Sequence, residues 1–171
     1  DDVTVAFFYD CDGDRDLDLF TGGGGNFAAA NSGSYQNQLF INDGKGNFIL
    51  KRGSLPPLNT NCGGAAAIDF DKDGDLDLVI GSRSVPQNYG VTPRSAILQN
   101  DGKGNYKDVT ATVAPDFAKA GMITSIAVAD INKDGNDDVI VVGDWMCPII
   151  FSFDGKKFIP VKTCLEQVTG L

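Results

Sequence analysis

The sequence contains no histidine, only one tryptophan and two methionines, and few basic residues. Without histidine, neither Ser-His or Cys-His nucleophilic catalysis nor a histidine-bearing zinc site can form. No apolar run approaches the roughly 18 residues that span a bilayer, which argues against membrane insertion. The sequence has 14 basic and 23 acidic residues, which gives a formal net charge of −9. Because nucleic-acid-binding proteins neutralise phosphates with Lys and Arg, this balance argues against a nucleic-acid partner.

The acidic residues that remain to carry chemistry gather in three short stretches. These are Asp10, Asp12, Asp14, Asp16 and Asp18; Asp69, Asp71, Asp73, Asp75 and Asp77; and Asp130, Asp134, Asp137 and Asp138. The rest of the chain carries more basic than acidic residues. The net charge therefore belongs to three local features rather than to a diffuse acidic surface.

The three stretches are copies of one repeat. They read DCDGDRDLDLFTG from residue 10, DFDKDGDLDLVIG from residue 69 and DINKDGNDDVIVVG from residue 130. A second element follows each of them: LFINDGKGNF from residue 39, ILQNDGKGNY from residue 97 and a weaker IFSFDGKKF from residue 150. The chain is thus three units with a period of about 60 residues, each with the same two landmarks in the same order.

Short apolar and β-branched runs surround these landmarks and are bounded by Gly, Asn and Asp, which is typical of strands joined by turns. The second unit offers four such runs, approximately Ala65–Phe70, Asp77–Gly81, Ser95–Gln99 and Asn105–Val109. We expect an all-β fold of three four-stranded antiparallel β-propeller blades, with a β-sandwich as the alternative. The blades should span about 3–52, 62–112 and 123–164 of a single partial propeller domain covering 1–171. One turn of helix is expected within 115–121.

The acidic loops resemble the FG-GAP and VCBS repeats of integrin alpha-subunit propellers and of secreted bacterial proteins. The segments GSRSVPQNYGVTPRSAILQNDGKGNYKDVT, APDFAKAGM and VVGDWM are similar to VCBS-type proteins related to cartilage acidic protein, especially the secreted bacterial ones. The resemblance implies propeller blades, a calcium loop between the first two strands of each blade, and an extracellular setting. It implies no activity, since such propellers serve adhesion, carbohydrate binding and scaffolding alike.

The chemistry of the loops points to calcium independently of the resemblance, because calcium takes six to eight oxygen ligands and alternating carboxylates on a tight loop converge on one point. Magnesium, which prefers rigid octahedral sites, and a solvated turn without metal are the alternatives. The loops are not EF-hands, because Ile80 stands where an EF-hand has its twelfth-position Glu. About three calcium ions are expected, one per loop. The predicted side-chain ligands are Asp10, Asp12, Asp14 and Asp18; Asp69, Asp71, Asp73 and Asp77; and Asp130, Asn132, Asp134 and Asp138, with Asp16, Asp75 and Asn136 at the position that donates a backbone carbonyl.

The first loop departs from the other two. Arg15 stands where they have Gly74 and Gly135, and its glycine, Gly13, comes two residues earlier. A non-glycine residue with positive φ costs about 1 kcal/mol or more. We therefore expect strain at Arg15 and the least regular metal site in this loop.

Repetition argues against catalysis by the same carboxylates. A glycoside hydrolase needs one pair of carboxyl groups about 5–10 Å apart in an open cleft, whereas these loops supply no unique pair. We expect no enzyme.

Long connections on the face opposite the metal loops contain Tyr35, Arg83, Tyr89 and Arg94, with Trp145 after the third blade's second strand. Such residues are typical of binding surfaces, but packing between blades is the favoured interpretation here.

Four cysteines fit an oxidising compartment and predict disulfides of open connectivity. Cys147 and Cys164 flank the last two predicted strands, whereas Cys11 and Cys62 lie near the starts of successive units. The chain starts at Asp1 without a Met or signal peptide, and we expect it to be a processed or partial chain.

Three blades are too few for a closed propeller, which has four to eight. We therefore expect further blades, from the same longer chain or from other subunits, to cover the end blades. The function that fits is a calcium-stabilised structural or adhesive module of a secreted or cell-surface protein, with a protein or glycan ligand. The alternative is a lectin-like propeller that binds glycans opposite the calcium loops, although those connections differ between units.

Overall fold

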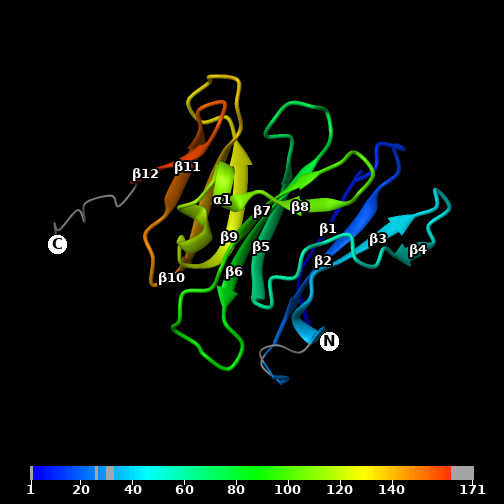
Figure 1. The fold of residues 1–171 in the computed structure, drawn as a ribbon, viewed down its shortest axis with the longest axis horizontal. Coiled ribbons are helices and arrows are strands. Elements are labelled where there is room, and N and C mark those ends of the chain that lie inside the picture. The colour runs from blue at the N-terminus through cyan, green and yellow to red at the C-terminus, as the bar shows by residue number, and fades with distance from the viewer. Residues whose placement is uncertain (1, 26, 30–32, 163–171) are drawn as a thin grey trace, which may run out of the picture.

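The structure, a computed structural model, describes residues 2–25, 27–29 and 33–162 and places them in three four-stranded antiparallel sheets (Figure 1). The strands are β1 Asp2–Tyr9, β2 Asp18–Gly24, β3 Gln38–Asn42 and β4 Phe48–Leu50; β5 Asn61–Ile68, β6 Asp77–Ser84, β7 Ala96–Asn100 and β8 Tyr106–Asp108; and β9 Met122–Ala129, β10 Asp138–Asp144, β11 Ile149–Phe153 and β12 Phe158–Lys162. Within each sheet the strands pair in sequence order. The predicted all-β fold of three blades is confirmed, and the blades form a partial propeller that is not closed.

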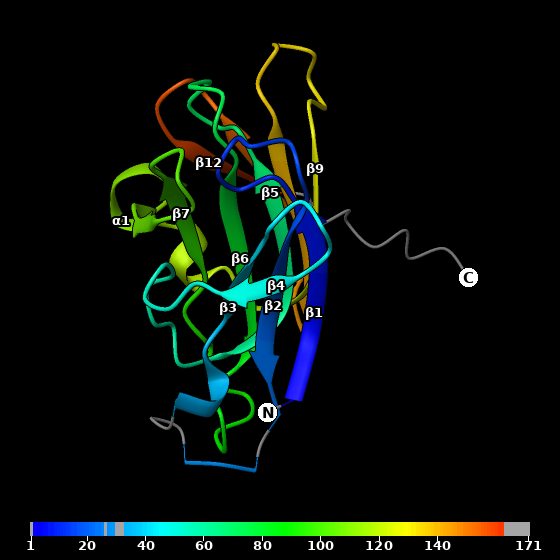
Figure 2. The same cartoon turned by 90° about the vertical axis from the view of Figure 1, so that its right-hand side faces the viewer.

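Helical structure within the described ranges is confined to the connections. The 3-10 helix η1, Gly33–Tyr35, precedes β3, while α1, Thr110–Val113, and the 3-10 helix η2, Phe117–Lys119, lie between β8 and β9. The turn of helix expected within 115–121 is confirmed by η2. The first strands of the three sheets, β1, β5 and β9, lie next to one another along one edge of the molecule (Figure 2).

The close approach of these first strands depends on glycine. A Cβ atom added to Gly63 of β5 would overlap the carbonyl oxygen of Ile123 in β9, and one added to Gly81 of β6 would lie 2.5 Å from an Ile123 methyl carbon. Side chains at these two positions would push the second and third blades apart. The glycines therefore set the spacing between these blades.

Two apolar cores fill the spaces between neighbouring blades. Alternate side chains of β6 point to opposite faces of its sheet. Leu78 and Ile80 belong to the core shared with the first blade, whereas Val79 belongs to the core shared with the third. Because both faces of the middle blade are covered, β6 is buried along nearly its whole length, and its apolar residues Leu78, Val79 and Ile80 follow one another without polar alternation.

The outward faces of the two end blades are apolar and exposed. On the third blade, Ile140, Ile150 and Val161 are consecutive partners across β10, β11 and β12. Val161 is 48% exposed, and Ile159, on the same face, is 49% exposed. On the first blade, Phe8 is 56% exposed and its ring contacts that of Phe48 at 5.9 Å.

Two of the four cysteines are core residues rather than parts of a disulfide. Cys11 and Cys62 are buried and free, so the expectation that they join a disulfide is wrong. Cys11 follows the end of β1 and Cys62 lies near the start of β5, at opposite ends of neighbouring blades. Burial raises the pKa of the Cys62 thiol to about 12, so it packs as a small apolar side chain. The pairing of Cys147 with Cys164 falls partly outside the described residues.

Candidate metal centres

The three acidic loops occupy equivalent positions in the three blades. Each connects the first strand of a blade to the second, at residues 10–17, 69–76 and 130–137. All three lie at the upper end of the molecule in Figure 1. The turns at 43–47, 101–105 and 154–157 join the third strand to the fourth at the same end. Both landmarks of the repeat therefore lie on one face of the molecule.

The aspartate that closes each loop is buried and holds the blade together. In the second loop, Asp77 Oδ2 accepts a hydrogen bond from the backbone N–H of Phe70 at 3.4 Å, and Asp77 Oδ1 accepts one from the N–H of Asn100 at 2.8 Å. One carboxylate thus ties the start of the loop to the end of β7. Asp18 bonds Cys11 and Asn42 in the same way, and Asp138 bonds Ile131 and Phe153.

The opening aspartate of each loop fixes the turn. Asp69 Oδ2 accepts the backbone N–H of Gly74 at 3.2 Å. The equivalent bonds run from Arg15 N to Asp10 Oδ2 at 3.0 Å and from Gly135 N to Asp130 Oδ2 at 2.9 Å. Since the same bond recurs in all three loops, Arg15 does not prevent the first loop from adopting the common shape.

Backbone conformation explains why Arg15 is tolerated. Each loop has two left-handed residues, at its fourth and sixth positions, and only one of the two is glycine. The pairs are Gly13 (φ 78°) and Arg15 (φ 76°), Lys72 (φ 61°) and Gly74 (φ 96°), and Lys133 (φ 61°) and Gly135 (φ 86°). The predicted strain at Arg15 is present, but every loop carries one such residue. The first loop is therefore not the exception that the sequence indicated.

Two of the loops bring three carboxylates together. One oxygen each from Asp10, Asp12 and Asp18 lies within 4.8 Å of the others, and Asp69, Asp71 and Asp77 form the same triad. No such acidic triad forms at the third loop within the described residues, because Asn132 occupies the middle position. The Asn132 amide pairs with Asp134 instead, with Nδ2 donating to Asp134 Oδ2 at 2.8 Å.

The remaining predicted ligands lie elsewhere in the same three loops. Asp14, Asp73 and Asp134 each accept a backbone N–H two residues further along their loops. A Cβ added to Gly102 would overlap Asp75 Oδ2, and one added to Gly44 would lie 3.1 Å from Asp16 Oδ2. The side chains of Asp16 and Asp75 therefore rest against the turn between the third and fourth strands. The backbone carbonyl as the ligand at this position, including that of Asn136, stays a prediction.

The electrostatics of the triads favour a bound cation. Asp12 Oδ1, Asp16 Oδ1 and Asp69 Oδ1 are buried and have no hydrogen-bond partner among the described residues. Burial raises the pKa of Asp77 to about 7, although the hydrogen bonds that its carboxylate accepts act to lower it. Burial also raises the pKa of Asp12, and repulsion from Asp14 and Asp18 adds to the increase. Buried carboxylate oxygens without donors are costly, and an all-oxygen donor set suits a hard cation such as calcium. The residues present fit such an ion.

Two asparagines outside the predicted ligand sets support these loops. Asn100 Nδ2 donates to the carbonyl of Cys11 in the first loop at 2.8 Å and to that of Leu76 in the second at 3.0 Å. Asn42 Nδ2 donates to the carbonyl of Leu17 within its own blade. An Asn stands immediately before both DGKGN turns, and this recurrence is the sequence signal that could have identified the two residues. Asn100 therefore links the first and second acidic loops through hydrogen bonds.

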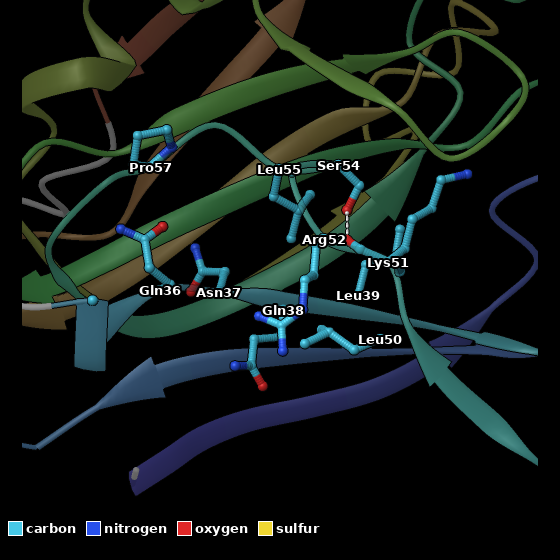
Figure 3. Close-up of a pocket in the computed structure, with 12 residues that line it drawn as sticks. Gln36, Asn37, Gln38, Leu39, Leu50, Lys51, Arg52, Ser54, Leu55 and Pro57 are labelled. Carbon is cyan, nitrogen blue, oxygen red and sulfur yellow. Dashed lines mark hydrogen bonds between the residues drawn. The ribbon is translucent and has the colours of Figure 1, made fainter.

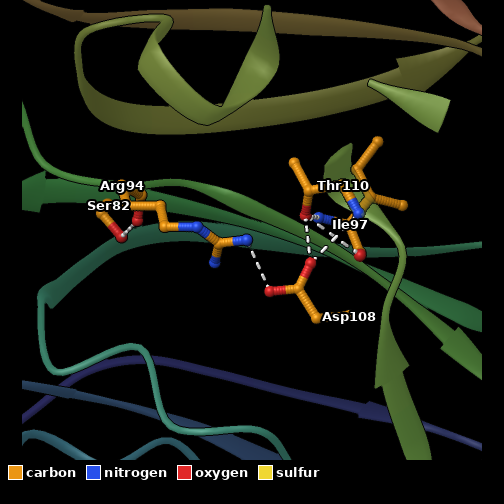
Figure 4. Close-up of polar contacts among 5 residues, drawn as sticks. All are labelled: Ser82, Arg94, Ile97, Asp108 and Thr110. Atoms are coloured by element: carbon orange, nitrogen blue, oxygen red, sulfur yellow. Dashed lines mark hydrogen bonds and ion pairs between the residues drawn. The ribbon is translucent and has the colours of Figure 1, made fainter. Parts of the chain in front are cut away.

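Aromatic and arginine residues of the long connections divide into two groups. Tyr35 is buried, which confirms packing as its role. Arg94 pairs with Asp108 at 2.6 Å, and Thr110 Oγ1 donates to the same carboxylate (Figure 4). Tyr89 and Trp145, in contrast, are 59% and 80% exposed, and the side chains of Arg83 and Arg94 are 53% and 45% exposed. The expectation that these four residues pack between blades is therefore wrong.

A cavity of about 410 Å³ lies at the outer part of the first blade (Figure 3). Gln36, Asn37 and Gln38 contribute amides to its wall. Asn37 Oδ1 already accepts the N–H of Gly23 at 3.2 Å, and Gln36 Nε2 donates to Asn59 Oδ1 at 2.8 Å. Gln36 therefore braces the segment that leads to the second blade, whereas Asn37 holds β2 of its own blade.

The fold and the repeated loops define a propeller-type repeat protein with an acidic loop in each blade. The FG-GAP-like repeat pattern matches residues 10–80 and 88–141, and the chain belongs to this family. No curated protein matches the chain significantly. The narrower relation to VCBS-type proteins and cartilage acidic protein stays a prediction. Among the helices of the described ranges, none has the length and apolar character needed to cross a membrane.

Proposed function

We propose that this chain is a calcium-binding propeller module with a structural or adhesive role in a secreted or cell-surface protein. The observation that carries the proposal is the recurrence of one loop in three blades, with three carboxylates within 4.8 Å in two of them. Buried carboxylate oxygens without donors in these loops support it further. A calcium ion held there would neutralise the carboxylates of the loop that joins the first two strands of each blade.

About three ions are assigned, one to each loop. The side chains that would hold them are Asp10, Asp12, Asp14 and Asp18; Asp69, Asp71, Asp73 and Asp77; and Asp130, Asn132, Asp134 and Asp138, with backbone carbonyls at Asp16, Asp75 and Asn136. The third loop has one carboxylate fewer because of Asn132, and a lower ligand charge weakens calcium binding. We therefore assign the weakest of the three sites to this loop.

An extracellular location and a non-catalytic role complete the proposal. Extracellular modules bind calcium with dissociation constants of about 10⁻⁴ to 10⁻³ M, which suits sites that stay occupied outside the cell. The carboxylates act as repeated structural ligands rather than as one catalytic pair. Further blades of this repeat type, from the same longer chain or from other subunits, cover the apolar faces that carry Phe8 and Val161.

Counting bound ions by native mass spectrometry tests the assignment. The chain is expected to bind about three calcium ions, and the double variant Asp69→Asn/Asp71→Asn to bind one fewer. Asp116→Asn, at an exposed residue outside the loops, is the matched control and should bind the same number as the parent chain. Equal ion counts in the double variant and the parent would contradict the site, and an equal preference for magnesium would contradict calcium as its ion.

A further inference from the structure

The cavity of about 410 Å³ at the outer part of the first blade is separate from the metal sites. Its wall comes from two segments, within residues 33–39 and 50–57, which lie before β3 and after β4 and include the adjoining ends of these strands. Neither segment contains a predicted metal ligand. A volume above about 300 Å³ is enough for a small ligand or for one or two residues of a larger one.

The sequence around this cavity has few acidic residues. Residues 19–68 contain Lys45, Lys51 and Arg52 but a single acidic residue, Asp43. Asp43 lies in the turn between β3 and β4 at the metal end, and none of the described residues that line the cavity is acidic. In a chain with a net charge of −9, a cavity wall with basic side chains and without carboxylates is a local exception that favours an anionic group.

Arg52 is the basic residue that remains available in this wall. Its side chain points from the connection after β4 across the cavity (Figure 3). It forms no ion pair or hydrogen bond within the described residues, whereas Arg83 and Arg94 each pair with an aspartate. Lys51, in contrast, already donates from Nζ to the carbonyl of Lys103 in the second blade. The guanidinium of Arg52 thus keeps all its N–H donors free, in a planar fork that matches a carboxylate.

The amide side chains of Gln36, Asn37 and Gln38 belong to the same wall. Asn37 uses Oδ1 and Gln36 uses Nε2 in the hydrogen bonds described above. Asn37 Nδ2 and the whole amide group of Gln38 have no partner among the residues that the structure describes. A free amide group donates as well as accepts hydrogen bonds. This side of the cavity therefore matches the N–H and C=O groups of a peptide backbone.

The rest of the wall is apolar and comes from Leu39, Leu50, Leu55 and Pro57. Leu39 is buried, whereas Leu50 and Leu55 are half-buried and Pro57 is exposed. Binding sites for organic ligands typically combine such an apolar lining with a few polar groups that fix the orientation of the ligand. The lining here fits a ligand in which an apolar group stands next to a carboxylate.

We propose that this cavity binds an acidic peptide segment of a partner protein. An Asp or Glu carboxylate of the segment pairs with Arg52, a neighbouring apolar side chain rests on Leu50 and Leu55, and the backbone bonds the amide of Gln38. One available guanidinium balances one carboxylate but not the charge of about −2 on a phosphate group. Because the site lies apart from the acidic loops, it does not depend on whether they hold calcium.

Fluorescence anisotropy with labelled peptides tests the proposal. Pools of hexapeptides, blocked at both ends, carry Asp or Glu at one fixed position, and matched pools carry Asn or Gln there. At least one acidic pool should bind the full chain in a saturable manner, and its matched amide pool should bind about tenfold more weakly or less. Because the net charge of −9 repels acidic peptides from the chain as a whole, such binding reports on a local basic site.

Arg52→Ala and Lys107→Ala form a matched pair, because each removes one exposed positive charge but only Arg52 lines the cavity. Arg52→Ala should weaken binding about tenfold or more, and Lys107→Ala should leave it unchanged. Arg52→Lys, which keeps the charge but loses the planar fork, should have an intermediate effect. Since Arg52 has no partner within the described residues, the melting temperature of its variants should equal that of the parent chain.

Three results would overturn the proposal: no saturable binding of any acidic pool, equal binding by Arg52→Ala and the parent chain, or equal binding of the acidic and amide pools. Acidic oligosaccharides, applied to the same samples, separate the carboxylate of a peptide from that of a sugar. Their saturable binding at Arg52 in place of peptides would also contradict a peptide ligand.

Discussion

Single residues in the acidic loops show how a repeat tolerates variation. The backbone needs two left-handed residues per loop, and glycine supplies one of them at either the fourth or the sixth position. The position of the glycine can therefore change without changing the hydrogen bond to the opening aspartate. The shape of the loop depends on these bonds more than on where the glycine stands.

Replacing Arg15 by glycine should stabilise the protein. The substitution removes the left-handed strain at φ 76°, offset partly by the greater flexibility of glycine in the unfolded chain. We expect a gain of about 0.5–1 kcal/mol in the free energy of unfolding, measured by urea denaturation. Gly13→Ala, two residues away at φ 78°, should destabilise by a similar amount. A loss of stability in Arg15→Gly would contradict this account of the loop.

The buried closing aspartates should matter far more than their neighbours. Asp138→Ala leaves the N–H groups of Ile131 and Phe153 without their acceptor. We expect a loss of about 2–4 kcal/mol in the free energy of unfolding with calcium present. Asp137→Ala, at the adjacent exposed carboxylate, should change stability by no more than about 0.5 kcal/mol. Equal losses in the two variants would show that overall negative charge, rather than the hydrogen bonds of Asp138, determines stability.

The sequence predicted the loop residues because their alternation is regular and repeated. It did not predict that Lys72 and Lys133 adopt positive φ, since their side chains give no local signal for it. Tyr89 and Trp145 were interpreted wrongly for a similar reason: whether an aromatic residue packs or faces solvent depends on neighbouring blades that composition does not place. The exposure of such residues is determined by tertiary contacts rather than by the sequence pattern.

At the scale of elements, the blades are joined by polar links at the metal end as well as by apolar cores. Tyr9 of β1 and Tyr106 of β8 share a hydrogen bond at 2.8 Å, and Asn100 of β7 reaches the carbonyls of Cys11 and Leu76. Strand positions were predictable from turn residues and β-branched runs. These links were not, because they join residues far apart in sequence.

Asn100→Ala should weaken calcium binding at the first two loops together. The variant removes the donors that hold Cys11 and Leu76, one in each loop, while the third loop has no bond to Asn100 within the described residues. Calorimetric titration should show two weakened sites and one unchanged site.

Asn42→Ala is the control for this coupling, because within the described residues the Asn42 side chain donates only to Leu17, in the first loop. It should weaken one site. If Asn100→Ala also weakened one site only, the proposed link between the two loops would be wrong.

At the scale of the whole molecule, three blades leave two apolar faces in solvent. Ile140, Ile150 and Val161 form a row on the outer face of the third blade. In the middle blade the equivalent face is covered by the next blade, so this row is a surface of the kind that packs between blades. Exposed apolar faces of this kind favour association.

Charged substitutions on this outer face should reduce self-association without unfolding the chain. We expect Ile159→Lys/Val161→Lys to lower the average mass measured by light scattering at high protein concentration, with stability changed by no more than about 1 kcal/mol. Val91→Lys, at an exposed residue outside this face, should leave the mass unchanged. If the parent chain were monomeric at all concentrations, the inference that the outer face of the third blade binds another blade would be contradicted.

The proposed function depends on calcium as the ion that holds the acidic loops closed, and thermal unfolding with and without calcium is the sharpest test of it. Ligands that bind only the folded state stabilise it by about 2.7 kcal/mol at a hundredfold excess over the dissociation constant. Calcium should therefore raise the melting temperature by several degrees, an excess of chelator should reverse the increase, and Asp69→Asn/Asp71→Asn should reduce it. An identical melting temperature in calcium and in chelator would contradict the assignment of calcium to the acidic loops.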